Sequence, residues 1–456
     1  MSRFLIAGVS ALALLAVGCG DDDGGSARNR CSDFSTANCV TIASGDVQAL
    51  INAVNTLQDD TTILLEAGTY ALDRTVTIRN SGINLVGQGI DETILDFETS
   101  PGGGNGVDVI GDSFLVQDLT VANAKKDGIR VEDSDGVIFR RIKATWTRGP
   151  HTSNGAYGIY PVKSRNVLVE DSVAENASDA GLYVGQCINV IVRRNEVRQN
   201  VAGLEIENTQ YADVYENHAE NNTAGIVVFD LPGNPVVGRD VRIRDNQIID
   251  NNHTNFAPGG TVAMIPPGTG TFALASRRVE IFNNVYRNNY TASIAILNGL
   301  VVDPRDSWAL ETSAIIGDID DLDLPTGDEG IVYNYESTEI YIHDNDIEND
   351  GTAEINPQEF GLLMGVLYGG EPEVDHVIYD GVGETVDAET PANTSNVNHI
   401  CVDQASMVVL GLGLEGGELT FPESLGDVAR FSAPDLAPFD CSSFTGGPLV
   451  VPSDLP

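Results

Sequence analysis

Basic residues are scarce in this 456-residue sequence, which sets 25 Lys and Arg against 67 Asp and Glu. The resulting net charge of −42 would repel the phosphates of nucleic acids and the headgroups of anionic lipids, so we expect no nucleic acid partner. Aromatic residues make up only 6% of the chain, whereas 48 residues are glycine. This composition is unlike that of a coiled coil or a disordered chain, and it favours a β-rich fold with many turns.

The apolar run at 4–17 is too short for a stable membrane-spanning helix. Arg3 precedes this run and small residues lead from it to Cys19, a pattern that resembles the signal peptide and lipobox of bacterial lipoproteins. We therefore expect a signal peptide at 1–18, lipidation of Cys19 and a flexible Gly- and Asp-rich tether at 19–30. The expected location is the cell envelope, on the outer membrane or cell surface, with the lipid as the only membrane contact.

Cysteine is also infrequent, with six residues in the chain. If Cys19 carries lipid, an oxidising envelope allows two local disulfides, Cys31 with Cys39 and Cys401 with Cys441. Cys187 is then left over inside a strongly patterned segment, where we expect it to be a small buried apolar side chain rather than a nucleophile.

A repeat in the sequence indicates the fold, which the composition alone does not. Glycines followed by alternating apolar residues recur at steps of 22, 30, 23, 22 and 22 residues, and a second series of short apolar strands lies between them. A period near 22 with short strands and no helical pattern is typical of one coil of a parallel β-helix. The prediction is an all-β, single-stranded parallel β-helix. The glycines are Gly106, Gly128, Gly158, Gly181, Gly203 and Gly225.

The repeat also suggests how the chain is organised. Residues 46–54 read as a short amphipathic helix that covers the first coil, and 31–300 form the main β-helix. Residues 301–456 are expected to add further coils, at 330–333, 339–342 and 361–364, with acidic loops around 303–329 and 369–396 and a C-terminal tail. Asparagines that follow the second strand of each coil should form turns and a stacked ladder. They are Asn195, Asn217, Asn246, Asn284 and Asn345.

Three segments within 155–208, Gly-Ala-Tyr-Gly-Ile-Tyr-Pro-Val, Ser-Asp-Ala-Gly-Leu-Tyr-Val-Gly-Gln and Val-Ala-Gly-Leu-Glu-Ile-Glu-Asn, resemble an uncharacterised family of exported bacterial parallel β-helix repeat proteins. That family lies in the pectate-lyase-like right-handed β-helix superfamily, which includes polysaccharide lyases, hydrolases and alginate epimerases. The resemblance implies a right-handed β-helix over roughly 60–300. The Asp-Pro-His motif of the periplasmic alginate epimerases is missing at 159–163, and the polygalacturonase motifs are absent.

Residues two and four after each repeat glycine should point outward from one face. Tyr160 and Tyr183 could form a platform for a sugar ring, and Glu205 and Glu207 could place two carboxylates about 6–7 Å apart, as inverting glycosidases do. We expect an open groove here, with a half-buried face covered by loops as the alternative. The remaining candidate binding or catalytic residues of this column and its strand ends are Arg130, Lys163, Gln186 and Asp230.

The longest interruption of the repeat is the segment 146–157. Because insertions in a solenoid project as loops, Arg148 could neutralise a uronate carboxylate and His151 could move a proton. The alternative is a structural loop anchored by Trp146.

No cofactor is evident, but the acidic excess leaves calcium open beside a simple solvated surface. The weak calcium candidates are Asp318, Asp320, Asp321 and Asp323, which do not follow the EF-hand pattern.

Two functions follow from these features. The chain binds a polysaccharide along one face and, if it is an enzyme, acts as a lyase, epimerase or glycoside hydrolase. The alternative is a non-catalytic scaffold or adhesion protein that docks to another exported protein.

Overall fold

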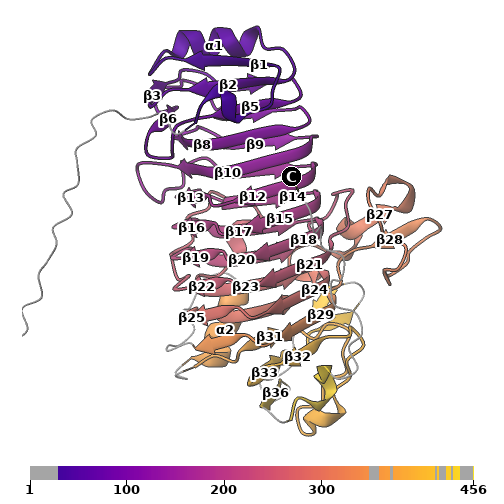
Figure 1. Cartoon of the computed structure of the whole chain (residues 1–456). Helices are drawn as coiled ribbons and strands as arrows, with labels where there is room; N and C mark the ends of the chain where they lie inside the picture. Colours follow the sequence, from indigo (N-terminus) through magenta and orange to yellow (C-terminus); the bar gives the residue numbers. More distant parts are fainter. Residues whose placement is uncertain are drawn as a thin grey trace, which may run out of the picture.

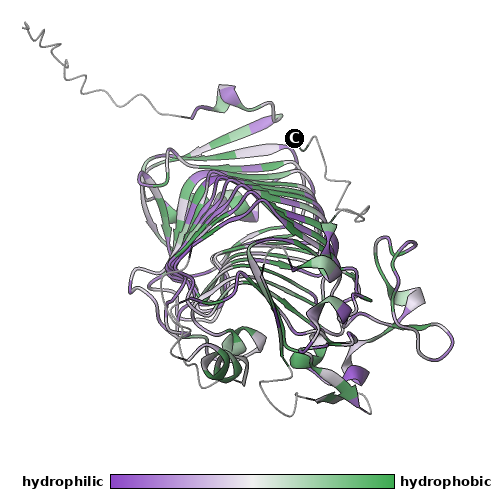
Figure 2. Ribbon diagram, turned by 90° about the horizontal axis from the view of Figure 1, so that it is seen from below, coloured by the Kyte–Doolittle hydropathy of each residue, from purple (hydrophilic) through white to green (hydrophobic). Residues whose placement is uncertain are grey.

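The computed structural model describes residues 29–348, 359–369, 373–415, 418–420, 428–432, 435–441 and 455. These residues form a parallel β-solenoid of about 14 turns, as the repeat predicted (Figure 1). Each coil contributes strands to three walls, and equivalent strands of neighbouring coils pair in register. Seen along the axis, the coils superimpose on one another (Figure 2). The expected signal peptide and Cys19 lie outside the described residues.

The first wall is the 12-stranded sheet. Its strands are β4 (Val76–Ile78), β7 (Val107–Val109), β9 (Ile129–Glu132), β11 (Ile159–Val162), β14 (Ala180–Gly185), β17 (Ala202–Glu207), β20 (Ala224–Phe229), β23 (Thr269–Leu274), β26 (Ala292–Leu297), β31 (Val377–Tyr379), β33 (Ser406–Val409) and the antiparallel β36 (Ala429–Ser432).

The second and third walls together form the 20-stranded sheet, because two long strands bend from one wall into the other. These strands are β8 (Phe114–Ala122) and β10 (Asp135–Thr145). The second wall also contains β1 (Asn38–Ile42), β2 (Thr61–Leu65), β5 (Ile83–Val86), β12 (Arg165–Glu170), β15 (Ile188–Arg193), β18 (Gln210–Tyr215), β21 (Arg239–Arg244), β24 (Arg277–Phe282), β29 (Thr338–His343) and β32 (Cys401–Asp403). The third wall adds β3 (Gly68–Ala71), β6 (Thr93–Asp96), β13 (Val173–Glu175), β16 (Glu196–Arg198), β19 (His218–Glu220), β22 (Gln247–Ile249), β25 (Val285–Arg287) and β30 (Asp346–Glu348).

The repeat glycines are explained by the close approach of successive coils. A Cβ atom on Gly128 would lie 2.4 Å from the carbonyl oxygen of Gly158, and one on Gly158 would lie 2.5 Å from that of Gly181. Both distances are far below van der Waals contact. Glycine at the start of the first-wall strand is therefore a steric requirement of stacking, which is why it marks the period so clearly in the sequence.

The asparagine ladder is present at the bend between the second and third walls. Asn195 Nδ2 donates to Asn217 Oδ1 at 2.9 Å, and the series continues through Asn246 and Asn284 to Asn345. A second buried ladder follows the third wall and was not expected from the sequence. It joins Asn200, Asn222, Asn251 and Asn289 at 3.0–3.1 Å. Each ladder satisfies buried amides that would otherwise be costly to desolvate.

The interior is filled by apolar side chains from all three walls, and a helix closes its first coil. This helix, α1 (Val47–Asn55), begins after Asp46, whose carboxylate accepts from the Ala49 backbone N–H at 2.9 Å. Leu50 on its inner face is fully buried. The capping helix expected at 46–54 is thus confirmed, and it covers β1 at one end of the solenoid (Figure 1).

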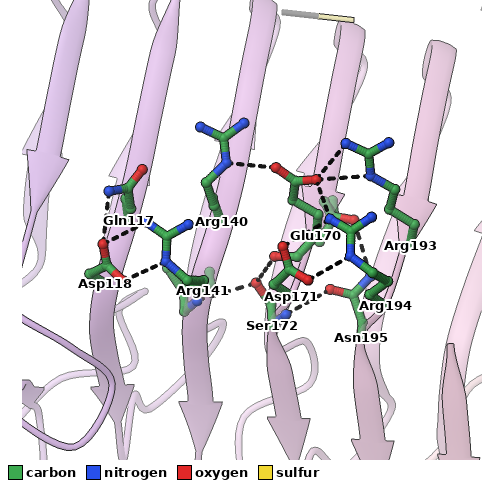
Figure 3. Close-up of polar contacts among 12 residues, drawn as sticks. Gln117, Asp118, Arg140, Arg141, Glu170, Asp171, Ser172, Arg193, Arg194 and Asn195 are labelled. Carbon is green, nitrogen blue, oxygen red and sulfur yellow. Dashed lines mark hydrogen bonds and ion pairs between the residues drawn. The ribbon is translucent and has the colours of Figure 1, made fainter. Parts of the chain in front are cut away.

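The outer surface of the second wall carries a ladder of arginines and acids (Figure 3). Glu170, whose side chain is 5% exposed, accepts from Arg140, Arg193 and Arg194 at 2.6–2.8 Å. These partners lower the pKa of Glu170 to about 2, against the opposing effect of burial. On the preceding coils, Arg141 likewise holds Asp118 in a two-point ion pair.

The region beyond residue 300 differs from the expectation in two places. The segment 330–333 does not form a coil: β28 (Ile331–Tyr333) pairs antiparallel with β27 (Ala309–Glu311) in an arm, residues 303–334, that projects from the solenoid (Figure 1). The segment 361–364 lies in α2 (Glu359–Tyr368), since a short apolar run without alternation does not distinguish strand from helix. The segment 339–342 does lie in a coil strand, β29.

Both expected disulfides, Cys31–Cys39 and Cys401–Cys441, are present. Cys187 is buried, its Sγ lies 3.2 Å from the Gly185 carbonyl, and burial raises its pKa to about 12. The Cys187 thiol is therefore buried and unreactive, as expected. No helix in the described part of the chain is long and apolar enough to cross a membrane.

Candidate functional site

Tyrosines and carboxyl groups gather on the outer surface of the first wall, where β9, β11, β14 and β17 lie side by side. We call this set the acid–tyrosine face. Register places Tyr160 beside Arg130, and Tyr183 beside Glu205, in one outward column. Three further residues of the face, Asp127, Tyr157 and Asp179, lie one or two positions before a repeat glycine. Its members are Asp127, Tyr157, Tyr160, Asp179, Tyr183, Glu205 and Glu207.

Three tyrosine rings form a compact cluster on this face. The ring centroids of Tyr157, Tyr160 and Tyr183 lie 4.5–4.8 Å from one another. Tyr183 lies over Gly185, where a Cβ atom would stand 2.3 Å from its ring. Its hydroxyl donates to Glu207, while the Tyr157 hydroxyl donates to Asp179. The predicted tyrosine pair is therefore a triad, and each of two hydroxyls holds a carboxylate.

Four carboxyl groups on the face have raised pKa values. Burial, followed by the charges of its acidic neighbours, raises the pKa of Glu205 well above its usual range. Burial is also the main cause for Glu207 and Asp179, whose pKa values rise to about 7, and for Asp127, at about 6. Carboxyl groups that exchange protons near neutrality are typical of general acids and bases.

The expected open groove is only partly present, which corrects the prediction. Tyr183, Glu205 and Glu207 point outward from the coil but are buried, and the two glutamates are 2% and 7% exposed. Asn234 covers Glu207 and donates to it at 2.8 Å. Tyr183 belongs to a second apolar cluster outside the first wall, to which Phe256 also packs.

The open part of the face lies toward the N-terminal coils. Tyr157, Tyr160 and Asp179 are half-buried there, and Tyr160 lies beside Arg130. A ligand from solvent therefore meets Tyr157, Tyr160 and Asp179 first, and Glu205 and Glu207 lie behind them.

The two predicted cations of this column already have acidic partners. Arg130 pairs with Glu132 and, at 3.5 Å, with Asp108. The more exposed Lys163 also pairs with Glu132, at 3.3 Å. Gln186 is half-buried at the bend that follows β14, where its backbone N–H donates to the Glu207 carbonyl.

Asp230 belongs to the interior rather than to the face. Its side chain is buried and accepts from Arg277 at 2.8 Å, and it also accepts from Asn334 and the Gly238 backbone N–H. A carboxylate so enclosed has a structural role, which corrects its prediction as a substrate-binding residue.

The loop 146–157 is anchored by Trp146, whose Nε1–H donates to the Ala124 carbonyl at 2.7 Å. Within it, Ser153 binds both predicted residues: its hydroxyl accepts from Arg148, and its backbone N–H donates to His151 Nδ1. In the described part of the chain, the side chains of Arg148 and His151 contact Ser153 and Glu98, not the tyrosines. The structure favours the alternative of a Trp-anchored loop, which delivers Tyr157 to the face.

Two of the calcium candidates, Asp318 and Asp321, bond to residues of the second wall. Asp321 accepts from Arg239 and Arg278, both at 2.6 Å, and Asp318 accepts from Tyr211 and donates its backbone N–H to Gln210. These contacts fasten the arm to β18, β21 and β24. Among the described residues, no three His, Cys, Asp or Glu side chains gather in a group that could hold a metal ion. Calcium therefore stays a prediction without a site in this part of the chain.

Sequence reasoning missed Tyr157, Asp179 and Asp127. The outward column was counted from residues that follow the repeat glycines, whereas these three precede Gly128, Gly158 and Gly181 by one or two positions. For Asp127 and Tyr157 the available signal was the residue directly before the repeat glycine, which is Asp or Tyr here and Ala in later coils, at Ala180, Ala202 and Ala224.

Comparison with known proteins concerns the fold. The model of the family described as "Right handed beta helix region" matches residues 81–241 and 152–303. No curated protein matches the sequence.

Among solved structures, an alginate lyase from Paenibacillus sp. str. FPU-7 is 14% identical with a TM-score of 0.44, over 68% of this chain and 95% of that one. The A-module of the mannuronan C-5 epimerase AlgE4 from Azotobacter vinelandii is 14% identical with a TM-score of 0.41, over 76% and 90%. The N-terminal fragment of bacteriophage Phi29 gene product 12 is 12% identical with a TM-score of 0.41, over 56% and 58%. Likenesses at this level say nothing about a reaction. The family match over 81–303, together with the three walls of parallel strands, shows that the chain has the right-handed parallel β-helix fold expected from the sequence.

Proposed function

We propose that the protein binds a polysaccharide across the open part of the acid–tyrosine face. One observation carries this proposal: the half-buried rings of Tyr157 and Tyr160 lie together, and Tyr157 bonds to Asp179, whose pKa is raised to about 7. Tyrosine rings stack on the apolar faces of sugars, and carboxyl groups bind their hydroxyls. The solenoid extends such a surface along its axis, which suits a polymer. The cell envelope remains the expected location.

Of the three reaction classes expected from the sequence, hydrolysis of a glycosidic bond suits these residues best. A lyase or epimerase that acts on uronates needs a cation to neutralise the substrate carboxylate, but Arg130 and Lys163 are paired with acids and Arg148 donates to Ser153 within its own loop. Hydrolysis with inversion needs a protonated carboxyl group to donate to the glycosidic oxygen as its bond to the anomeric carbon breaks, and a second carboxylate to take a proton from the water that attacks this carbon. Asp179 suits the role of acid, because burial raises its pKa to about 7.

The test is a screen of the purified protein against glycans, with binding and new reducing ends as readouts. Tyr157→Ala with Tyr160→Ala should weaken binding at least about tenfold, because two stacking rings are lost. Tyr215→Ala, which removes a ring from the second wall, is the matched control and should leave binding unchanged. Retained affinity in the double variant would show that the face is not the binding site.

The catalytic step has its own variant. Asp179→Asn should keep binding but reduce the release of reducing ends about 100-fold or more, since an amide cannot donate the proton. Asp133→Asn, an exposed acid at the bend after β9, serves as the control. Binding without any product from the wild-type protein would remove the hydrolytic step and leave a glycan-binding protein.

The scaffold alternative rests on the projecting arm, which presents exposed acidic side chains and the exposed Ile316 (Figure 1). If no glycan binds and a protein from the same envelope is retained by the wild type but not by a variant lacking 303–334, the protein is a docking scaffold.

A further inference from the structure

The charges around the acid–tyrosine face do not balance. Besides the four carboxyl groups with raised pKa values, Asp108 and Glu132 border it. The cations that the structure places nearby are Arg79 and Arg130 on Asp108, Arg130 and Lys163 on Glu132, and Lys126 beside Asp127. In the described part of the chain, Asp179 and Glu207 bond to uncharged tyrosine and asparagine groups.

Asp127 shows the deficit most directly. Its side chain is 1% exposed, and neither carboxylate oxygen has a partner at good hydrogen-bond geometry among the described residues, although the Tyr157 backbone N–H lies close enough to lower its pKa. The nearest cation, Lys126, stands 3.9 Å away and is itself largely in solvent. Asp127 acts electrostatically on Tyr160 and Asp179, so it lies against the open part of the face. A buried carboxylate without donors is costly unless a ligand supplies them.

An anionic ligand would make this deficit worse. A uronate carboxylate placed on the tyrosines would face Asp179 and Glu207, and the two cations of this column in the described part of the chain, Arg130 and Lys163, are already bonded to acids. The protein as a whole carries a net charge of −42, which repels polyanions and steers polycations toward it.

We infer that the polysaccharide bound on this face is cationic, an amino-sugar polymer with free amines whose ammonium groups bond to the carboxylates beside Tyr157 and Tyr160. This inference rests on the proposed function and narrows it to one substrate class. The sugar ring lies on the tyrosines, and each ammonium group supplies up to three donors to oxygens that lack them. An ammonium ion also favours the ionised form of a nearby carboxyl group, so binding should release protons.

The test compares three hexasaccharides by calorimetry at pH 6: β-1,4-linked glucosamine, the neutral β-1,4-linked glucose oligomer and a β-1,4-linked mannuronate. We expect the glucosamine oligomer to bind at least about tenfold tighter than the glucose oligomer, and the uronate not to bind. Repeating the titration in two buffers of different ionisation enthalpy should reveal proton release with the glucosamine oligomer only.

The variant Asp127→Asn with Glu207→Gln, which leaves Asp179 in place, should bring the two affinities together by weakening the glucosamine oligomer while keeping the glucose oligomer bound. The pair Asp133→Asn with Glu216→Gln, exposed acids at bends, is the matched control and should keep the preference. Equal or tighter binding of the neutral or anionic oligomer would overturn the cationic preference but leave glycan binding intact. Failure of all three to bind, together with an empty glycan screen, would overturn the proposed function itself.

Discussion

The outer surfaces of the first and second walls are built by the same repeat, and they treat carboxyl groups in opposite ways. On the second wall, Glu170 is surrounded by three arginines and its pKa falls to about 2 (Figure 3). On the first wall, Glu205 and Glu207 are buried beside other acids and tyrosines, and their pKa values rise. Burial is the largest single effect for all three groups, so the partners decide the direction.

This difference separates a structural surface from a candidate site. The ion pairs of the second wall satisfy one another and leave little for a ligand to add. The first wall instead holds carboxyl groups whose ionised forms lack cationic partners, at a cost in folding free energy that a functional site can justify. In a chain with so few basic residues, the placement of those residues is therefore as informative as the placement of the acids.

The largest expected effect comes from exchanging one carboxyl group for an amide on each wall. Glu170→Gln should lower the free energy of unfolding at pH 8 by about 2 kcal/mol, because three arginines lose a charged acceptor. Glu205→Gln should raise it by about 1 kcal/mol or more, because the folded state no longer buries a group that prefers to ionise in solvent. Chemical denaturation measures both, with the exposed Glu216→Gln as a control near zero. Changes of equal sign would break the comparison between the walls.

The pH dependence of stability should show the two walls separately. Asp127, Asp179 and Glu207 have folded pKa values of about 6 to 7, raised from 3.8 or 4.5, so the stability they contribute is complete below about pH 4 and is lost as pH rises through 6 to 7. Glu170, lowered from 4.5 to about 2, contributes stability above pH 4.5 that is lost as pH falls toward 2.

The unfolding midpoint should therefore be highest near pH 4 to 4.5 and fall on either side. Asp179→Asn with Glu207→Gln should flatten the decline between about pH 4 and 7 and leave the acid side unchanged, whereas Glu170→Gln should do the reverse. Thermal unfolding across this pH range is the measurement. An unaltered decline in the double variant would mean that these carboxyl groups do not hold protons in the folded protein.

The sequence predicted the solenoid well because its signals are local. A Cβ atom on Gly128 would lie 2.4 Å from a carbonyl oxygen of the next coil, so the repeat position requires glycine, and each ladder asparagine bonds to its equivalent one coil away. Both requirements leave a mark in the sequence about every 22 residues. The third-wall ladder from Asn200 to Asn289 was as regular and could have been found in the same way.

The site was harder to predict because burial is not local. The alternation of apolar residues correctly gave the direction of Glu205 and Glu207, but nothing near them indicates that Asn234, 27 residues after Glu207 in sequence, covers the face. Likewise, the apolar runs at 331–333 and 361–364 could be strands or helices until their partners are known. Asp230 needed Arg277, 47 residues away, to be recognised as structural.

The smallest expected effect concerns Asp321, an acid that is paired with arginines although its side chain is exposed. The side chain of Asp321 is 61% exposed, yet Arg239, whose side chain is 3% exposed, and Arg278 lower its pKa to about 2. Asp321→Asn should weaken the attachment of the arm by at most about 1 kcal/mol, as expected of a solvent-screened ion pair, and leave the global unfolding midpoint nearly unchanged. The sensitive measurement is limited proteolysis within 303–334 at neutral pH, where cleavage should be several-fold faster than in the wild type. Asp328→Asn, an exposed acid on the same arm, provides the matched control. Equal cleavage rates for the two variants would mean that Asp321 does not fasten the arm. The ion pairs that lower the pKa of Asp321 would then add nothing to the stability of this region.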